Sequence, residues 1–155
     1  MNETTANSQE QKVAPAFGIE KIYVKDISFE APNVPEIFKE EWKPAVSLAL
    51  DIAVNKLSAD IYEVVLKLTV TNKVNEKIAF LIEISQAGIF TIKGLKDEQV
   101  KTLAGVMCPQ ILFPYAREAV SDLTGKGGFP PLYLAPINFE SLYQQKKAES
   151  DKETK

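Results

Sequence analysis

Side chains that could do acid–base or nucleophilic chemistry are scarce in this chain of 155 residues. It has no histidine, the usual general base and the commonest zinc ligand, and a single cysteine, Cys108. Cys108 stands between Met107 and Pro109 with no adjacent cation to activate it, so we interpret it as a small buried apolar residue. The phosphate-binding pattern G-x-x-x-x-G-K-[ST] and the dinucleotide pattern G-x-G-x-x-G are both absent. These features argue against an enzyme, a metal site or a cofactor, and favour a protein that acts by binding.

Composition is that of an ordinary globular protein with a weak negative charge. The chain is 45% hydrophobic and 25% charged, with a formal net charge of −3 at pH 7. It has no basic block to neutralise phosphates, so we expect no nucleic-acid binding. The polar residues 1–16 lack the apolar stretch of a signal peptide, and no run approaches the roughly 18 apolar residues that span a bilayer. With one cysteine and hence no internal disulfide, the chain is predicted to be cytoplasmic, without direct membrane insertion.

Four segments have the composition of β-strands: residues 19–26, 47–55, 61–71 and about 78–92. Apolar and polar residues alternate in the second and third, which predicts strands with one face on a core. Short polar connections at 55–60 and 72–76 predict antiparallel hairpins. In the fourth, both alternate sets are apolar, with Ile82 and Ile84 against Leu81, and one layer of helices would cover only one side. That pattern predicts a contact with another subunit.

Helices are expected after the strands. Asp97 is predicted to cap a helix that Pro109 breaks or kinks, and a second stretch then continues, with Pro114 near its start, until Gly125. Asn138 is predicted to cap a last helix. The fold class is therefore α+β: a four-stranded antiparallel sheet with C-terminal helices on one face, joined by a Gly/Pro-rich crossover loop. We expect one domain over residues 17–143, between disordered polar tails at 1–16 and 144–155.

Two surfaces are candidates for binding. Aromatic residues could simply fill the core, or they could line a groove for extended, unfolded polypeptide. An acidic set could be a solvated face or a docking surface for a basic partner: if residues 24–26 are strand, Asp26 points with Val24 and away from Lys25, and Leu81 shares a face with Glu83. Nothing in the sequence places these carboxylates in an apolar cleft that would suit acid–base catalysis.

The stretch 111–139, ILFPYAREAVSDLTGKGGFPPLYLAPINF, closely resembles the C-terminal signature of the SecB family of bacterial protein-export chaperones, in its LFPYARE, GGFPPL and L-x-P-I/V-N-F blocks. Four further blocks match that family in the expected order: IYVKDISFEAPN at 22–33, WKP at 42–44, YEVVL at 62–66 and FLIEISQAGIF at 80–90. The resemblance covers nearly everything from residue 19 to residue 143.

This resemblance implies an ATP-independent holdase that binds unfolded secretory precursors, keeps them translocation-competent and delivers them to the SecA motor. It implies a homotetramer built as a dimer of dimers. The residues that it assigns to SecA docking are Asp26, Glu30, Leu81 and Glu83. The residues in the blocks of the expected client groove are Phe38, Trp42, Phe129, Pro130 and Leu132. We assign the opposite side of the fourth strand, Ile82, Ile84 and Gln86, to the oligomer interface.

Other interpretations stay open at this point. A small-molecule carrier with an enclosed apolar pocket would also explain the aromatic residues and the missing chemistry. It would not explain the acidic set. A SecB-like role attached to a toxin–antitoxin system is a further alternative within the same resemblance, and an enzyme would need catalytic groups that the sequence does not offer.

Overall fold

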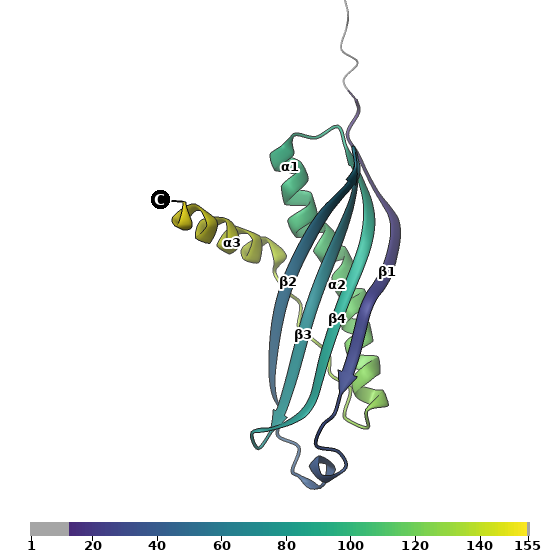
Figure 1. Cartoon of the computed structure of the whole chain (residues 1–155), viewed down its shortest axis with the longest axis vertical. Helices are drawn as coiled ribbons and strands as arrows, with labels where there is room; N and C mark the ends of the chain where they lie inside the picture. Colours follow the sequence, from purple (N-terminus) through teal and green to yellow (C-terminus); the bar gives the residue numbers. More distant parts are fainter. Residues whose placement is uncertain (1–12, 155) are drawn as a thin grey trace, which may run out of the picture.

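Four long antiparallel strands form a single sheet in the computed structural model, which describes residues 13–154 (Figure 1). They are β1 (Ala16–Glu30), β2 (Ala45–Ser58), β3 (Ile61–Val74) and β4 (Lys77–Lys93), in the spatial order β1-β4-β3-β2. Consecutive strands β2, β3 and β4 are joined by tight turns, as the short polar connections predict. The loop that holds the short 3₁₀ helix η1 (Glu36–Lys39) connects β1 at one edge of the sheet to β2 at the other edge.

A long helical segment covers one face of the sheet, which we call the inner face (Figure 1). It consists of α1 (Asp97–Thr102), the π-helical turn η2 (Leu103–Met107) and α2 (Cys108–Lys126). The opposite side of the sheet is called the outer face below. The observed architecture confirms the predicted α+β class, with an antiparallel sheet and the helices after it in the chain.

The predicted break at Pro109 takes the form of a widened turn. Proline has no N–H to donate and its ring crowds the preceding turn, so an ordinary α-helical path is disfavoured there. The backbone N–H of Cys108 instead donates to the carbonyl of Leu103, five residues earlier. Pro114 lies inside α2 rather than near a helix start, and the N-cap of α1 is Lys96, one residue before the predicted Asp97.

Alternation in β3 places Leu66, Leu68 and Val70 on the inner face, where all three are fully buried. Facing side chains of α2, among them Leu112 and Val120, complete this core and are fully buried as well. The backbone approaches closely at Gly88, as predicted for a glycine inside a strand, because a Cβ there would lie 2.8 Å from the Phe90 ring and 3.1 Å from Leu112.

The predicted oligomer interface does not fit this packing. Ile82 and Ile84 are 0% exposed and Gln86 is 3% exposed in the single chain, on the inner face beneath α2. They have no surface to offer another subunit. The chain's own α2 supplies the cover that the sequence pattern predicts from a partner, while Leu81 and Glu83 on the outer face are half-buried.

The last helix, α3 (Phe139–Glu153), begins as predicted and ends later. The side chain of Asn138 accepts a hydrogen bond from the Ser141 N–H at 3.0 Å, so the predicted cap is confirmed. The prediction of a disordered tail from residue 144 is wrong as far as Glu153, because the helix continues and extends from the body of the sheet (Figure 1). Of the predicted N-terminal tail, residues 1–12 lie outside the described residues, and β1 begins at Ala16.

Candidate functional site

The four predicted docking residues lie on the outer face, on the neighbouring strands β1 and β4. Glu30 stands opposite Leu81, and Asp26 stands opposite Ser85 on the same face as Glu83. Residues directly opposite each other in an antiparallel pair share a face. The structure therefore gathers Asp26, Glu30, Leu81 and Glu83 into one surface, which we call the acidic face; their role in docking stays a prediction.

A β-bulge decides which way Asp26 points. Val24 pairs with Gln86 on the inner face, and the next pair along is Asp26 with Ser85, so Lys25 is the extra residue of the bulge. The prediction that Asp26 points with Val24 is wrong for this reason. Without the bulge, Asp26 would have faced the core.

Within residues 13–154, the carboxylates of the acidic face have no ion-pair partner. Leu81 and Glu83 stand opposite Thr71 and Thr69 of β3, whose side chains are short. Asp26 and Glu30 are exposed, and Glu83 is half-buried. The ion pairs of the described residues are Lys25–Glu63, Lys43–Glu41, Lys77–Glu40, Lys126–Asp122 and Lys146–Asp51. None of these pairs neutralises Asp26, Glu30 or Glu83.

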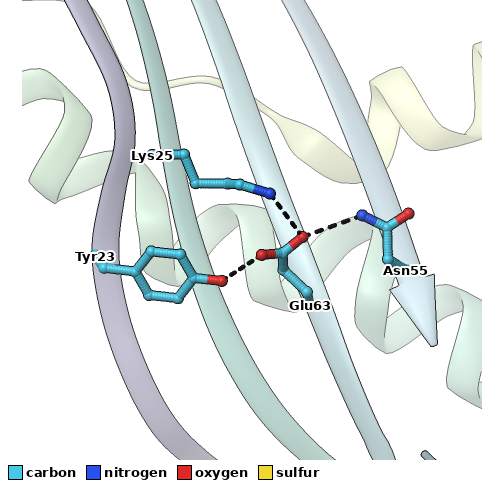
Figure 2. A network of polar contacts seen from close by, with 4 residues as sticks. All are labelled: Tyr23, Lys25, Asn55 and Glu63. Atoms are coloured by element: carbon cyan, nitrogen blue, oxygen red, sulfur yellow. Dashed lines mark hydrogen bonds and ion pairs between the residues drawn. The ribbon is translucent and has the colours of Figure 1, made fainter. Parts of the chain in front are cut away.

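A polar network crosses the outer face beside the bulge (Figure 2). Glu63 of β3 accepts a short hydrogen bond from the Tyr23 hydroxyl, one from Lys25 Nζ at 3.1 Å and one from Asn55 Nδ2 at 3.1 Å. The hydrogen bond from Tyr23 is the largest cause that lowers the pKa of Glu63, and those from Asn55 and Lys25 add to it against an opposing effect of burial. Burial, and then the hydrogen bond to Glu63, raise the pKa of Tyr23 to about 12.

Sequence reasoning missed this network because its members come from three strands whose spatial order differs from their chain order. The signal that the sequence offers for the network is weak: Tyr23, Asn55 and Glu63 each lie in a predicted strand and each has a polar group that can form a hydrogen bond. Once β4 is placed between β1 and β3, the small side chain of Ala87, opposite Tyr23, leaves room for the tyrosine to reach Glu63.

On the other side of the molecule, the crossover loop brings an aromatic cluster together. The ring of Phe129 lies 5.1 Å from Phe38, 5.7 Å from Trp42 and 5.2 Å from Phe80, measured between ring centroids. Phe129 is 5% exposed, whereas Phe38 is 50% and Trp42 is 38% exposed. Phe129 therefore fills the centre of the cluster, and Phe38 and Trp42 present its open surface.

The loop that carries Phe129 is held in shape at both ends. Gly127 packs so closely on the Phe29 ring that a Cβ would overlap it, and Gly128 has φ +85°, a conformation that side chains disfavour. The backbone N–H of Leu132 donates to Thr124 Oγ1 at 3.0 Å. Of the remaining predicted groove residues, Pro130 is exposed and Leu132 is half-buried.

An apolar groove that sequence reasoning missed runs between β2 and the helices. It has a volume of about 730 Å³. Its floor is the inner side of β2, and its walls come from α1, η2 and most of the length of α3, as far as Asp151. The apolar lining residues are Leu48, Leu50, Ile52, Val54, Val100, Ala104 and Leu142. The alternation of β2 predicts a strand with one face on a core. However, β2 is an edge strand and α2 lies over β3 and β4. Leu48 and Val54 therefore stay 39% and 44% exposed.

No helix in residues 13–154 is long and apolar enough to cross a membrane. In that same part of the chain, no group of three or more acidic or cysteine side chains is arranged to hold a metal ion. Cys108 is fully buried, and burial raises the pKa of its thiol to about 12, which agrees with a structural role.

Comparison with known proteins identifies the class of protein that carries these two surfaces. The family model described as preprotein translocase subunit SecB matches residues 10–150. The protein-export protein SecB of Marinobacter nauticus is 51% identical over 144 residues, which cover 93% of this chain and 87% of that protein. The SecB of Methylobacillus flagellatus is 51% identical over 152 residues, covering 98% and 96%.

Among solved structures, a SecB-like chaperone of Mycobacterium tuberculosis, in complex with a peptide from an antitoxin, matches with a TM-score of 0.66. It is 21% identical and covers 78% of this chain and 90% of that chain, a likeness that shows the shared fold. Together with the family match, the chain belongs to the SecB family of protein-export chaperones. Its function is that of a protein-export chaperone, and chaperones of this family are not enzymes.

Proposed function

We propose that this protein is an ATP-independent holdase of the cytoplasm that binds unfolded secretory precursors, keeps them translocation-competent and delivers them to SecA. One observation carries the proposal. The acidic face and the apolar surfaces lie on opposite faces of one sheet, so a client and a docking partner need not compete for the same side chains.

We assign the client to the aromatic cluster and the β2 groove. The cluster lies next to Ala45, the first residue of β2, and the apolar row of that strand leads from it to the groove at the helices. Phe38 and Trp42 would contact the client directly, Pro130 and Leu132 would border the same surface, and Phe129 would support it from below. Within the described residues β2 pairs only with β3, so its free edge offers backbone hydrogen bonds to an extended chain of any sequence.

We assign SecA to the acidic face. A sheet surface with Leu81 and three carboxylates that have no ion-pair partner among the described residues suits a basic segment with an apolar residue at its centre. In such a contact the charges raise the association rate and select the partner, and the buried leucine contributes apolar contact. Once SecA is docked, its own affinity for the client would compete with that of the chaperone and move the client onward. The chaperone would need no nucleotide site for this transfer.

A homotetramer remains part of the proposal, through surfaces other than those we first assigned. In the described residues β1 pairs only with β4, which leaves its outer edge free, and Met107 of η2 and Tyr115 of α2 are 44% and 51% exposed. Unpaired edges and exposed apolar side chains are features that assembly covers. Several grooves on one assembly would hold an unfolded chain by many weak and quickly reversible contacts.

Separation of the two activities tests the proposal. The double change Phe38→Ala with Trp42→Ala should weaken binding of an unfolded precursor and leave SecA binding intact. Glu83→Lys should weaken SecA binding and leave precursor binding intact, while Glu20→Lys, on the outer face at the far end of β1, serves as a matched charge control. If either surface variant lost both activities while its helical and strand content stayed native, the two sites would not be separate.

A further inference from the structure

We infer that Glu63 is a positioning residue for the acidic face, because it holds Lys25 away from Asp26 and so keeps that carboxylate free for a basic partner. The inference rests on the proposed docking of SecA at this face. It adds a role for two residues, Lys25 and Glu63, that lie outside the docking set itself.

The bulge in β1 creates the problem that Glu63 solves. Asp26 stands opposite Ser85 on the outer face, and the preceding Lys25 is the extra residue of the bulge. Because Lys25 Nζ donates to Glu63 on the outer face, both side chains lie on that face at neighbouring positions of the strand. The same bulge that turns Asp26 outward therefore also places a cation beside it. A lysine free to pair with Asp26 would cancel one of the three carboxylates that attract the partner.

Lys25 is instead drawn across β4 to β3. Its Nζ lies 3.1 Å from Glu63 Oε1, and the Lys25 side chain is 45% exposed whereas that of Glu63 is 12% exposed (Figure 2). The acceptor is also held independently of the lysine, since the Tyr23 hydroxyl and Asn55 Nδ2 donate to the Glu63 carboxylate. An anchored carboxylate loses less side-chain freedom when it pairs than Asp26 would on the exposed strand. The lowered pKa of Glu63 keeps it charged at neutral pH.

The test is Glu63→Gln, which keeps the shape of the side chain and an oxygen that can accept from Tyr23, and removes the charge that holds Lys25. Binding of labelled SecA should weaken roughly two- to five-fold at low salt, as expected for a surface charge pair, and the difference should vanish at about 1 M salt. Binding of an unfolded precursor should not change, which also shows that the variant is folded.

A matched pair of second changes separates this mechanism from a simple change in net charge. Lys25→Met added to Glu63→Gln should restore SecA binding, because the freed cation is gone. The control is Lys21→Met added to Glu63→Gln, which has the same net charge as the first double variant. Lys21 lies on β1 as Lys25 does, and it is on the outer face because it stands opposite Ile89, as Glu63 does. This control should not restore SecA binding. Equal rescue by both would overturn the inference.

Single changes keep the inference testable if Glu63→Gln does not fold. In the otherwise unchanged chain Lys25 is already held by Glu63, so Lys25→Met should affect SecA binding no more than Lys21→Met does. A clearly larger gain with Lys25→Met would mean that Lys25 pairs with Asp26 in the native protein, and would overturn the inference.

Asp26→Asn distinguishes failure of the inference from failure of the proposed docking. If Asp26→Asn leaves SecA binding unchanged, the acidic face is not the docking site and the inference falls with it. If Asp26→Asn weakens binding and Glu63→Gln does not, the docking site stands and only the positioning role of Glu63 is refuted.

Discussion

Replacing Phe129 by alanine should remove the support of the client surface. Phe129 is 5% exposed and touches three other rings, so its truncation loses almost the whole transfer free energy of the side chain and leaves a cavity. Changes of this kind cost about 3–5 kcal/mol of the free energy of unfolding. Phe38→Ala provides the comparison: that ring is 50% exposed, and its loss should cost roughly 1 kcal/mol.

The assay uses Trp42, the only tryptophan in the chain, as a reporter inside the cluster. Urea unfolding followed by circular dichroism gives the free energies, at one protein concentration because assembly would shift the apparent stability. In the Phe129→Ala variant, native-state Trp42 emission should shift to longer wavelength as the indole gains contact with water. Precursor binding should weaken while SecA binding persists.

The contrary outcome is that Phe129→Ala costs no more free energy of unfolding than Phe38→Ala and leaves the Trp42 emission in place. Phe129 would then not be the residue that fixes the crossover loop on the sheet, and the openness of the cluster would have another cause.

Three further predictions concern single residues. Because folding lowers the pKa of Glu63, the Glu63 carboxylate stabilises the fold above roughly pH 4.3, and this stabilisation is lost as the pH falls through the lowered pKa. In the Glu63→Gln variant, the free energy of unfolding measured in urea should therefore decrease less over this acidic range. The buried Cys108 thiol, with its pKa raised to about 12, should stay unreactive toward a disulfide reagent at pH 8 until the protein unfolds, and rapid labelling of the native protein would contradict its burial. Asn72 is 1% exposed, and its Oδ1 accepts no hydrogen bond from the described residues. Asn72→Leu should therefore raise the free energy of unfolding by about 1–3 kcal/mol in urea unfolding. A loss of stability would show that another group, such as a water, donates a hydrogen bond to Oδ1.

Much of the sheet could be predicted because central strands obey a simple alternation. In β3 every second residue from Val64 to Val70 is buried, and the observed strand contains the predicted one. β1 extends beyond the predicted strand at both ends, and Asp26 does not share a face with Val24, because bulges at Glu20 and Lys25 each add a residue and reverse the alternation. Nothing in the local sequence marks a bulge without knowledge of the partner strand.

The last helix shows what a search for apolar periodicity misses. Residues 144–152, QQKKAESDK, have no apolar stripe, yet they contain several strong helix formers and continue a helix already begun by a good cap. Local propensity was the signal that would have extended the prediction. The first turns of the helix bury Phe139 and Leu142, and its remainder extends from the body of the sheet (Figure 1).

For the binding surfaces, residue types were easier to predict than contacts. The acidic set and the aromatic residues were named from the sequence, and the structure gathers each set as a group. The assignment of Ile82, Ile84 and Gln86 failed because the sequence does not show which side of a doubly apolar strand its own helix covers. The Glu63 network and the β2 groove depend on the strand order β1-β4-β3-β2, which only the folded chain supplies.

The measurement that tests the central claim most directly is fluorescence anisotropy of the protein with one secretory precursor, presented first unfolded and then folded, without ATP. Holdase activity predicts tight binding to the unfolded form alone. Equal binding to both forms, or binding to neither, would contradict the proposal, and mass spectrometry for a small molecule held in the 730 Å³ groove would then be the next experiment.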